Sequence, residues 1–165
     1  MYRSIWLLPI LIALVVIPLA PAVADDAGVC ATASGDEAIA ACSRIIQSGE
    51  KSGRELAVIY RHRGVALRIK GDNDKAIADY NEAIRLNSDR DEGTIYNRGM
   101  CYSQMKEYAL ALADFTRCLE LDPDWAWAFS ERGRVYFYFK EYDKAIADGS
   151  NAIKYKPNYF HGYLI

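Results

Sequence analysis

One stretch of sequence occurs three times in this chain, and that repetition constrains the fold more than any other feature. DKAIADYNEAIRL (Asp74–Leu86) returns as DKAIADGSNAIKY (Asp143–Tyr155), with ALALADFTRCLEL (Ala109–Leu121) between them. Glycines recur at matching points, spaced 35 and then 34 residues apart, at Gly64, Gly99 and Gly133. A period of this length indicates an array of repeated supersecondary units.

Each repeat is predicted to form two helices that pack against each other. In the first helix one large residue stands four positions before the glycine and another stands three after it, which places both on one helical face. In the second helix Ala76 and Ala83 flank Tyr80 on one face. Small residues let the backbones approach, and the aromatic slot of Tyr80 and Phe115 is expected to face the following repeat. Gly149 takes this slot in the third copy. Either no following repeat requires an aromatic ring at this position, or a residue of the C-terminal tail fills the space.

This pattern resembles the tetratricopeptide repeat family, whose signature is W-x-x-L-G-x-x-Y…A-x-x-x-F…P at a period of about 34 residues. Three similar copies span Ala57–Pro157, although Trp is missing from the first slot and Arg replaces Leu before each glycine. The resemblance implies an all-α fold. In that fold antiparallel helix pairs form a right-handed superhelical solenoid, and their first helices line a concave groove.

The chain is expected to contain a leader, a capping segment and three repeats. Ser34 with Glu37 forms a capping box typical of a helix start, which predicts an N-terminal capping helix at about residues 36–47. The predicted boundaries are 1–24 for a signal peptide, 25–56 for the segment with the capping helix, 57–91, 92–125 and 126–159 for the repeats, and 160–165 for the truncated start of a further helix.

The first residues are typical of an export signal. MYRS carries one positive charge, Ile5–Leu19 is an apolar run, and Ala22-Val23-Ala24 supplies the small residues that signal peptidase accepts. The apolar run is shorter than the roughly 20 residues of a membrane-spanning helix, so a cleaved signal is favoured over an uncleaved anchor. The expected protein is of an exported bacterial type, periplasmic or secreted, without stable membrane insertion after cleavage.

Charge and motif content argue against several classes of function. The formal net charge is −2, whereas nucleic-acid binders usually carry a basic stripe and anionic-membrane binders a polybasic face. No cofactor or metal is expected, because no Gly-rich phosphate loop follows a strand and no cysteine–histidine cluster is present. His62 and His161 have no partner at a spacing typical of a nucleophile–base pair, so the chain is predicted not to be an enzyme.

Four cysteines would mature in an oxidising compartment, where an even count favours disulfides. Cys30 lies just upstream of the capping helix and can reach back to Cys42, closing a loop worth roughly 3 kcal/mol. Cys101 and Cys118 lie on the two helices of one repeat. For them a disulfide and two buried thiols remain open alternatives.

One charge pair recurs in every repeat. An arginine precedes each repeat glycine, and an aspartate follows that arginine by 16 residues, giving Arg63–Asp79, Arg98–Asp114 and Arg132–Asp148. Bidentate Arg–carboxylate contacts suit partly buried sites. The pairs are therefore predicted to be structural, with an anion-binding stripe as the alternative.

First-helix positions that face away from the second helix are predicted to line a partner-binding groove. The predicted groove residues are Arg61, Val65, Arg68, Tyr96, Asn97, Met100, Trp127, Arg134 and Tyr138, with Val58, Gln104, Ser130 and Phe137 at further positions of the same helices. Their mixture of arginine, methionine and aromatic residues is typical of interface hot spots.

The resemblance also allows one known binding mode to be tested by position. Some family members clamp the acidic C-terminus of cytosolic heat-shock chaperones with a set of Lys, Asn and Arg side chains. Arg61 and Asn97 fit that set, but Val65, Trp127 and Glu131 occupy the other clamp positions. This clamp is therefore not expected to assemble.

Together these features predict a non-enzymatic adaptor or scaffold of the bacterial cell envelope that binds a protein or peptide of unknown identity in its groove. The alternative is a structural protein that self-associates into a homo-oligomer by stacking through its exposed C-terminal end. That end gathers the apolar residues Tyr155, Tyr159, Phe160, Tyr163, Leu164 and Ile165.

Overall fold

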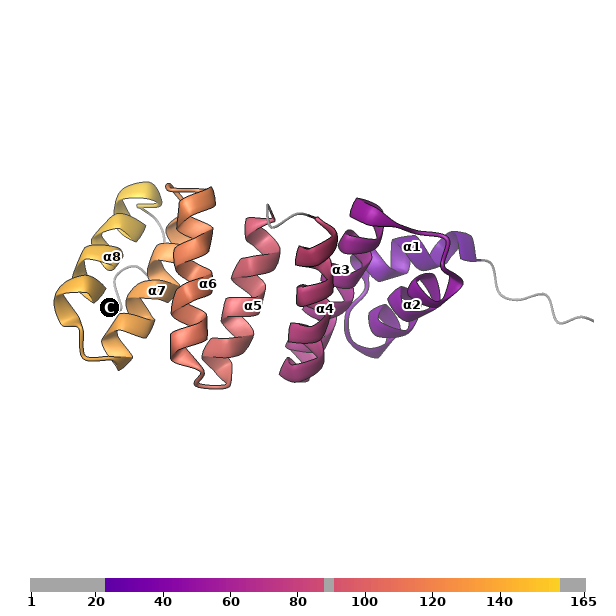
Figure 1. The fold of residues 1–165 in the computed structure, drawn as a ribbon, viewed down its shortest axis with the longest axis horizontal. Helices are drawn as coiled ribbons and strands as arrows, with labels where there is room; N and C mark the ends of the chain where they lie inside the picture. The colour runs from indigo at the N-terminus through magenta and orange to yellow at the C-terminus, as the bar shows by residue number, and fades with distance from the viewer. Residues whose placement is uncertain (1–22, 88–90, 158–165) are drawn as a thin grey trace, which may run out of the picture.

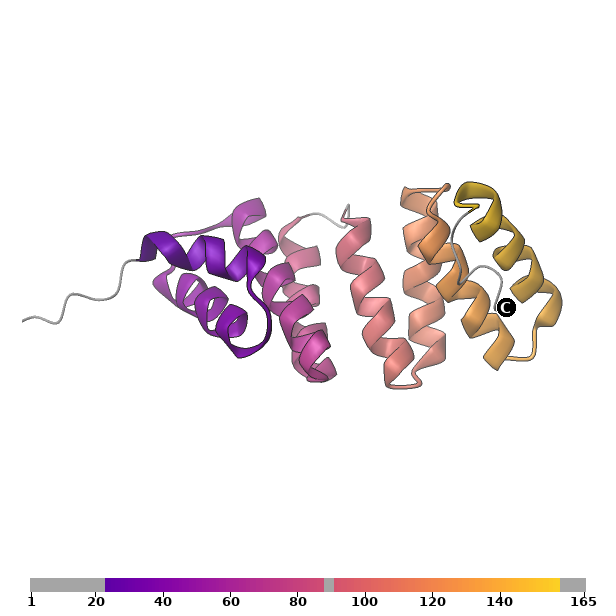
Figure 2. The same cartoon turned by 180° about the vertical axis from the view of Figure 1, so that it is seen from behind.

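The computed structural model describes residues 23–87 and 91–157, and every regular element in these ranges is a helix. In chain order the helices are α1 (Val23–Thr32), α2 (Gly35–Ser48), α3 (Gly53–Lys70), α4 (Asn73–Leu86), α5 (Glu92–Gln104), α6 (Tyr108–Leu121), α7 (Ala126–Tyr138) and α8 (Tyr142–Tyr155). They form an elongated array in which consecutive helices lie side by side (Figure 1 and Figure 2). The all-α prediction is confirmed.

The helices pack in pairs, α3 with α4, α5 with α6 and α7 with α8. Each first helix also contacts the first helix of the next pair, whereas α4 and α6, or α6 and α8, make no comparable contact in the described part of the chain. Because the first helices are drawn together and the second helices are spread, the array curves with α1, α3, α5 and α7 on its inner side. This is the solenoid that the repeat predicts.

The repeat glycine lies beneath an aromatic ring from the second helix of its own pair. A Cβ added to Gly64 would meet Tyr80 Cε1 at 2.7 Å, and one added to Gly99 would meet Phe115 Cε1 at 2.9 Å. Both rings are 0% exposed, and Tyr80 shares a core cluster with Cys101 of the next pair. The ring therefore faces the following repeat, as expected, and also packs within its own repeat.

The capping segment contains two helices where one was expected. Helices α1 and α2 are joined by a disulfide between Cys30 and Cys42, and both cysteines are buried. Arg44 of α2 also donates to both carboxylate oxygens of Asp26 in α1, with Nε 2.8 Å from Oδ2, and this contact lowers the pKa of Asp26. Sequence periodicity missed α1 because VADDAGVCAT has few large apolar residues to mark a helical face.

The prediction of a capping box at Ser34 is wrong, because its hydrogen bond does not form. Ser34 stands at the N-cap of α2, but its side chain makes no capping hydrogen bond. The next residue, Gly35, has a φ of 64°, which lies in the left-handed region. Because the box requires the residues after the cap to be in right-handed helical geometry, this conformation separates the Ser34 hydroxyl from the amides it would cap.

The two remaining cysteines are free and buried in the structure. They belong to different core clusters, Cys101 with Tyr80 and Cys118 with Phe129. Burial raises the pKa of the Cys101 thiol to about 11 and that of Cys118 to about 12. Of the two alternatives left open by the sequence, the structure contains the buried thiols.

Two predictions fall wholly or partly on residues outside the described ranges. These are the signal peptide, except for its last two residues, and the tail residues Tyr159, Phe160, Tyr163, Leu164 and Ile165. Within the described part, Tyr155 stacks on Phe129 with ring centroids 5.7 Å apart. Gly149 is buried in α8, at the position that Tyr80 and Phe115 hold in the earlier pairs. Over residues 23–87 and 91–157 no helix combines the length and apolar character needed to cross a membrane.

Replacing Gly99 with Ala is expected to destabilise the array, although Ala is the better helix former. The added Cβ would meet the buried ring of Phe115 at 2.9 Å. Overpacking of this kind costs about 1–3 kcal/mol, whereas helix propensity returns about 1 kcal/mol. Urea denaturation should therefore show a net loss of up to about 2 kcal/mol in the free energy of unfolding. Gly93→Ala is the control, because a Cβ there would meet only Asp91 Oδ1, at 3.3 Å; equal losses in both variants would contradict the role of the ring.

Candidate functional site

The inner side of the array, formed by α3, α5 and α7, is the surface on which the predicted groove residues were placed. A depression of about 350 Å³ opens at one end of it, between α3 and the start of α5. Arg54, Val58, Arg61, Asn87, Asp91 and Glu92 line this depression. The lining carries both signs of charge, so the depression suits a polar or zwitterionic group better than a purely apolar one.

Arg61 is the predicted residue that this depression contains. Its Nε lies 3.7 Å from Asp91 Oδ2, and this buried Nε has no hydrogen-bond partner in the described structure. Asp91 is itself occupied at the N-cap of α5, where it accepts from the Thr94 amide at 3.1 Å and from the Thr94 hydroxyl at 2.7 Å. The guanidinium is therefore held near a carboxylate that is already engaged, and keeps donor capacity for a ligand.

The predicted residues in the middle of the groove mostly serve the packing of the array. The ring of Tyr96 lies 5.7 Å from Phe115 and 5.0 Å from Trp125, centroid to centroid. Met100 packs against the cluster that contains Phe115, and Asn97 Nδ2 donates to the carbonyl of Gly93 at 2.7 Å. Because these side chains are half-buried, only part of each is accessible to a ligand.

Val65 and Arg68 of α3 are also half-buried. Val65 packs against the core cluster of Leu67 and Tyr80. Arg68 Nε is buried without a hydrogen-bond partner in the described structure, and the Arg68 side chain lies close enough to Tyr80 and Cys101 to influence their titration. Desolvation outweighs its effect, since burial still raises the pKa of the Tyr80 phenol. Arg68 therefore covers the core with its side chain.

Helix α7 carries the exposed members of the predicted set. Trp127 is 41% exposed, with Lys156 Nζ 3.9 Å from its ring centroid. Arg134, two turns further along the same face, donates to Glu131, which is only 6% exposed. Tyr138, one turn beyond Arg134, stacks on Tyr108 of α6 with centroids 4.6 Å apart. The spacing of Trp127, Arg134 and Tyr138 places all three on one side of α7, with Tyr138 at the end that contacts α6.

The three repeated Arg–Asp pairs come together between the two helices of each repeat. Arg63 meets Asp79 at 2.7 Å through both Nε and Nη2, Arg98 meets Asp114 at 2.9 and 2.7 Å, and Arg132 meets Asp148 at 2.7 and 2.8 Å. The aspartates are 3–6% exposed. The hydrogen bonds to the carboxylates raise the pKa of Arg63 and of Arg132.

Two of these arginines also reach back to the preceding helix pair. Arg63 Nη1 donates to Ser43 of α2 at 3.0 Å, and Arg98 Nη1 donates to Asn81 of α4 at 2.7 Å. The guanidinium thus links its own second helix to that of the repeat before it. With both carboxylate oxygens engaged, this geometry is that of a structural contact.

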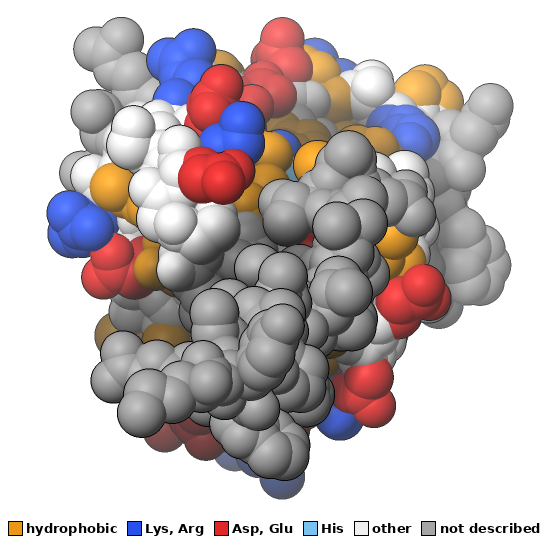
Figure 3. All heavy atoms as spheres, turned by 90° about the vertical axis from the view of Figure 1, so that its right-hand side faces the viewer, with side chains coloured by type: hydrophobic (Ala, Val, Ile, Leu, Met, Phe, Trp, Pro, Cys, Tyr) orange, Lys and Arg blue, Asp and Glu red, His pale blue; other side chains and the backbone are white. Residues whose placement is uncertain are grey.

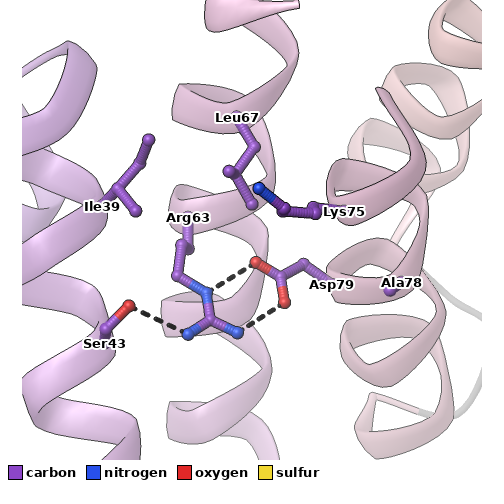
Figure 4. A pocket seen from close by; sticks show the side chains of 7 residues that line it. All are labelled: Ile39, Ser43, Arg63, Leu67, Lys75, Ala78 and Asp79. Carbon is purple, nitrogen blue, oxygen red and sulfur yellow. Dashed lines mark hydrogen bonds and ion pairs between the residues drawn. The ribbon is translucent and has the colours of Figure 1, made fainter. Parts of the chain in front are cut away.

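A second depression, of about 340 Å³, lies where α2, α3 and α4 meet around the first of these pairs (Figure 4). Ile39, Ser43, Arg63, Leu67, Lys75, Ala78 and Asp79 line it. In the close-up the polar groups of Ser43, Arg63 and Asp79 point toward one another (Figure 4). Because these groups satisfy each other, the depression is a seam between the capping segment and the first repeat.

Sequence reasoning missed several contributors to the inner surface, among them Arg54 and Glu92 of the depression. Asn87 and Asp91 come from the turn between repeats, where residues 88–90 lie outside the described ranges and spacing between helices gives no guide. Lys156 reaches Trp127 from beyond the end of α8. Of these, only Asp91 could have been predicted from the sequence, because an aspartate three residues before Thr94 is typical of the N-cap of a helix.

Of the two histidines, His62 lies in the part of the chain that the structure describes. His62 is half-buried on α3, and burial lowers its pKa; His161 lies outside the described residues. Within 23–87 and 91–157 no group of three or more His, Cys, Asp or Glu side chains is placed to hold a metal ion. At the end of the array shown in Figure 3, acidic and basic side chains are interspersed rather than gathered by sign.

The tetratricopeptide repeat family model matches residues 57–90 and 94–124. Two of the three predicted repeats therefore match the model of this family, and the predicted resemblance is confirmed for these two stretches. The first TPR of Spaghetti (RPAP3), solved bound to HSP90 peptide SRMEEVD, superposes with a TM-score of 0.65 at 22% identity, covering 70% of this chain and 91% of that one. At this identity the likeness shows the shared fold.

Two curated relatives are similar over part of the chain. The heat shock protein sti1 homolog of Schizosaccharomyces pombe is 39% identical over 77 residues, which are 47% of this chain and 13% of that protein. Human mitochondrial import receptor subunit TOM34 is 34% identical over 92 residues, or 56% of this chain and 28% of TOM34. The chain thus spans less than a third of either relative. Both are eukaryotic, which gives no support to the expected exported bacterial type.

Removing one partner of an Arg–Asp pair is expected to cost far more than removing an exposed charge. Arg98→Ala leaves the carboxylate of Asp114, 6% exposed, without its guanidinium, and an uncompensated charge of this kind costs about 3–5 kcal/mol. Arg117→Ala, which removes an exposed pair with Glu120, should cost less than about 1 kcal/mol. The measurement is the free energy of unfolding in urea. The double variant Arg98→Ala/Asp114→Ala should recover part of the loss; a loss equal to the sum of the single variants would show that the pair is not coupled.

Proposed function

We propose that the chain is a non-enzymatic protein-interaction module whose inner side binds a segment of a partner protein. The observation that carries this proposal is the pairing of Trp127, exposed by 41%, with Arg134 seven residues later on the same face of α7. An exposed indole and a guanidinium two turns apart on one helical face match the composition of interface hot spots, because the ring supplies apolar area and the arginine supplies directed hydrogen bonds. Solved relatives of this fold hold peptides, which supports the same use here.

The ligand that fits this surface is an extended or helical segment with an apolar anchor and acidic neighbours. The anchor would cover the Trp127 ring, and its carboxylates would meet Arg134 at one side and Arg61 in the depression at the other. Arg61 Nε is buried without a hydrogen-bond partner in the described structure, so an incoming carboxylate would satisfy it.

The ligand differs from the acidic chaperone tail named for the RPAP3 structure. Val65, Trp127 and Glu131 stand where the clamp for such tails would need its remaining polar and basic residues, and Asn97 already donates to Gly93. Glu131 is buried and would place a like charge close to a C-terminal carboxylate. The peptide SRMEEVD therefore serves as a negative control for binding.

Peptide selection from a displayed random library tests the proposal. The full chain should select segments that combine a large apolar residue with Asp or Glu, and Trp127→Ala should weaken the selected peptide about 30-fold, the size of a hot-spot loss. Leu110→Ala removes an apolar side chain of similar exposure, 48%, from the second helix α6, and should leave affinity unchanged. Selection of the same peptides by Trp127→Ala would refute the assignment of the groove.

We further propose that the protein works outside the reducing cytosol, as an adaptor or scaffold of a bacterial cell envelope. The signal-like N-terminus of the sequence supports this location, as does the Cys30–Cys42 disulfide of the capping segment. Stable disulfides form in the periplasm and in secreted proteins and are rare in the cytosol.

The location can be tested through the disulfide. Purified from an oxidising compartment, the chain should show one protected cystine at Cys30–Cys42 and two thiols after alkylation under denaturing conditions, read by peptide mass spectrometry. Replacing both Cys30 and Cys42 with Ser should lower the free energy of unfolding by about 3 kcal/mol, whereas Cys118→Ser tests a thiol outside the bond. Full alkylation of Cys30 in protein taken from its native cell would contradict the proposed compartment.

A further inference from the structure

Five aromatic side chains at one edge of the array contact one another in series. The ring of Tyr142 lies 5.7 Å from Phe137, Phe137 lies 6.4 Å from Tyr138, Tyr138 stacks on Tyr108 at 4.6 Å, and Tyr108 meets Phe139 edge-on at 6.3 Å, all between centroids. We call these five residues the tip patch, because they surround the turns that join α5 to α6 and α7 to α8. Figure 1 shows both turns at the same edge of the array.

The tip patch is largely exposed. Phe137, Tyr138, Phe139 and Tyr142 are 53, 52, 41 and 51% exposed. Since an aromatic side chain can bury about 150–250 Å², these four leave roughly 400 Å² of mostly apolar surface in water. An exposed patch of this size on a soluble protein is often an interaction site.

The helix pairs do not require these rings to close their turns. At the equivalent turn of the first pair the positions that match Phe137, Phe139 and Tyr142 are the polar residues Arg68, Lys70 and Asn73, and Tyr138 is matched by Ile69. Gly71 has a φ of 92°, and the matching residues Lys106 and Lys140 have φ values of 63° and 62°. The same left-handed turn therefore forms with and without aromatic neighbours, so the clustering of rings at the later turns serves something other than the turn.

The charges around the tip patch favour a particular occupant. Lys106 and Glu107 occupy one turn, and Lys140 and Glu141 occupy the next. In the described part of the chain Lys106, Glu107 and Lys140 form no ion pair, and Glu141 pairs with Lys144. A wholly acidic or wholly basic partner would meet a like charge at both turns. A surface that alternates Lys and Glu is instead complementary to a copy of itself turned about a two-fold axis.

We propose that the tip patch is a self-association surface on which a second copy of this chain docks about a two-fold axis. The rings supply roughly half of the about 800 Å² per partner that a stable interface buries, and the charged rim and Met105, itself 39% exposed, extend the contact. An aromatic centre within a polar rim is the usual anatomy of such an interface.

This dimer uses other residues than the proposed groove, although Arg134 stands one turn from Tyr138 of the tip patch. The tip patch lies at the turns, whereas Trp127, Arg134 and the depression at Arg61 lie along the inner side of the array. Two grooves would be carried by one dimer. If the proposed function holds, a partner with two matching segments would be bound with avidity; self-association itself does not depend on that function.

Sedimentation velocity of the full chain over a range of concentrations tests the proposal. The chain should form a closed dimer, and Phe137→Glu/Tyr142→Glu should raise its dissociation constant by at least about 30-fold, the size of a hot-spot loss. Ile69→Glu is the matched control, because Ile69 is 63% exposed at the turn of the first pair, and it should leave the dimer intact. Far-UV circular dichroism checks that every variant is folded.

Charge exchange supplies a second test that misfolding cannot imitate. Lys106→Glu/Lys140→Glu makes the rim acidic and Glu107→Lys/Glu141→Lys makes it basic, so each variant alone should stay monomeric through like-charge repulsion. Mixing the two should restore a one-to-one heterodimer in native mass spectrometry. Because Lys106 and Lys140 already hold positive φ, glutamate there adds little backbone strain.

Three outcomes would overturn the proposal. The chain could remain monomeric at every concentration, whether or not it binds lipid vesicles or another protein through the patch. It could form an open-ended series of oligomers, as stacking through the C-terminal end would produce. It could dimerise unchanged after Phe137→Glu/Tyr142→Glu. Loss of peptide binding in Trp127→Ala with the dimer retained would separate the two surfaces, so failure of the groove leaves this test intact.

Discussion

The close contact between a glycine and an aromatic ring sets the spacing on which the rest of the array depends. At 2.7 and 2.9 Å from a hypothetical Cβ, Tyr80 and Phe115 leave no room for any side chain on Gly64 and Gly99. The first and second helices of a pair can therefore approach until ring meets backbone. In the first two repeats the bidentate Arg–Asp pairs form between helices held at this separation.

The arginine beside each glycine adds a directional contact between the two helices of a repeat. It lies next to the glycine in sequence, so the spacing that seats the ring also brings the guanidinium to the aspartate of the second helix. The remaining nitrogen of Arg63 reaches Ser43 of α2, and that of Arg98 reaches Asn81 of α4. In a solenoid, where each repeat contacts only its neighbours, such a link couples adjacent repeats and opposes their separate unfolding.

The sequence predicted the features that recur and missed those that occur once. Helix pairs, their pairing and the positions of the Arg–Asp contacts all follow from the interval between glycines, because equal spacing places equal residues in equal environments. Helix α1 and the approach of Lys156 to Trp127 have no second copy to reveal them. The groove was overestimated for a related reason: spacing shows which side Tyr96 and Met100 face, but their burial depends on the neighbours they pack against.

The placement of Tyr138 shows how a repeat can supply two surfaces from one helix. Within α7, Trp127 and Arg134 face the inner side, but Tyr138 at the last turn stacks on Tyr108 of α6. A helix of 13 residues is about 20 Å long, so its two ends can meet different partners. The inner surface is built from the start and middle of the first helices, and the tip patch from their last turn and the start of the second helices. Ligand binding and self-association therefore need not compete for the same residues.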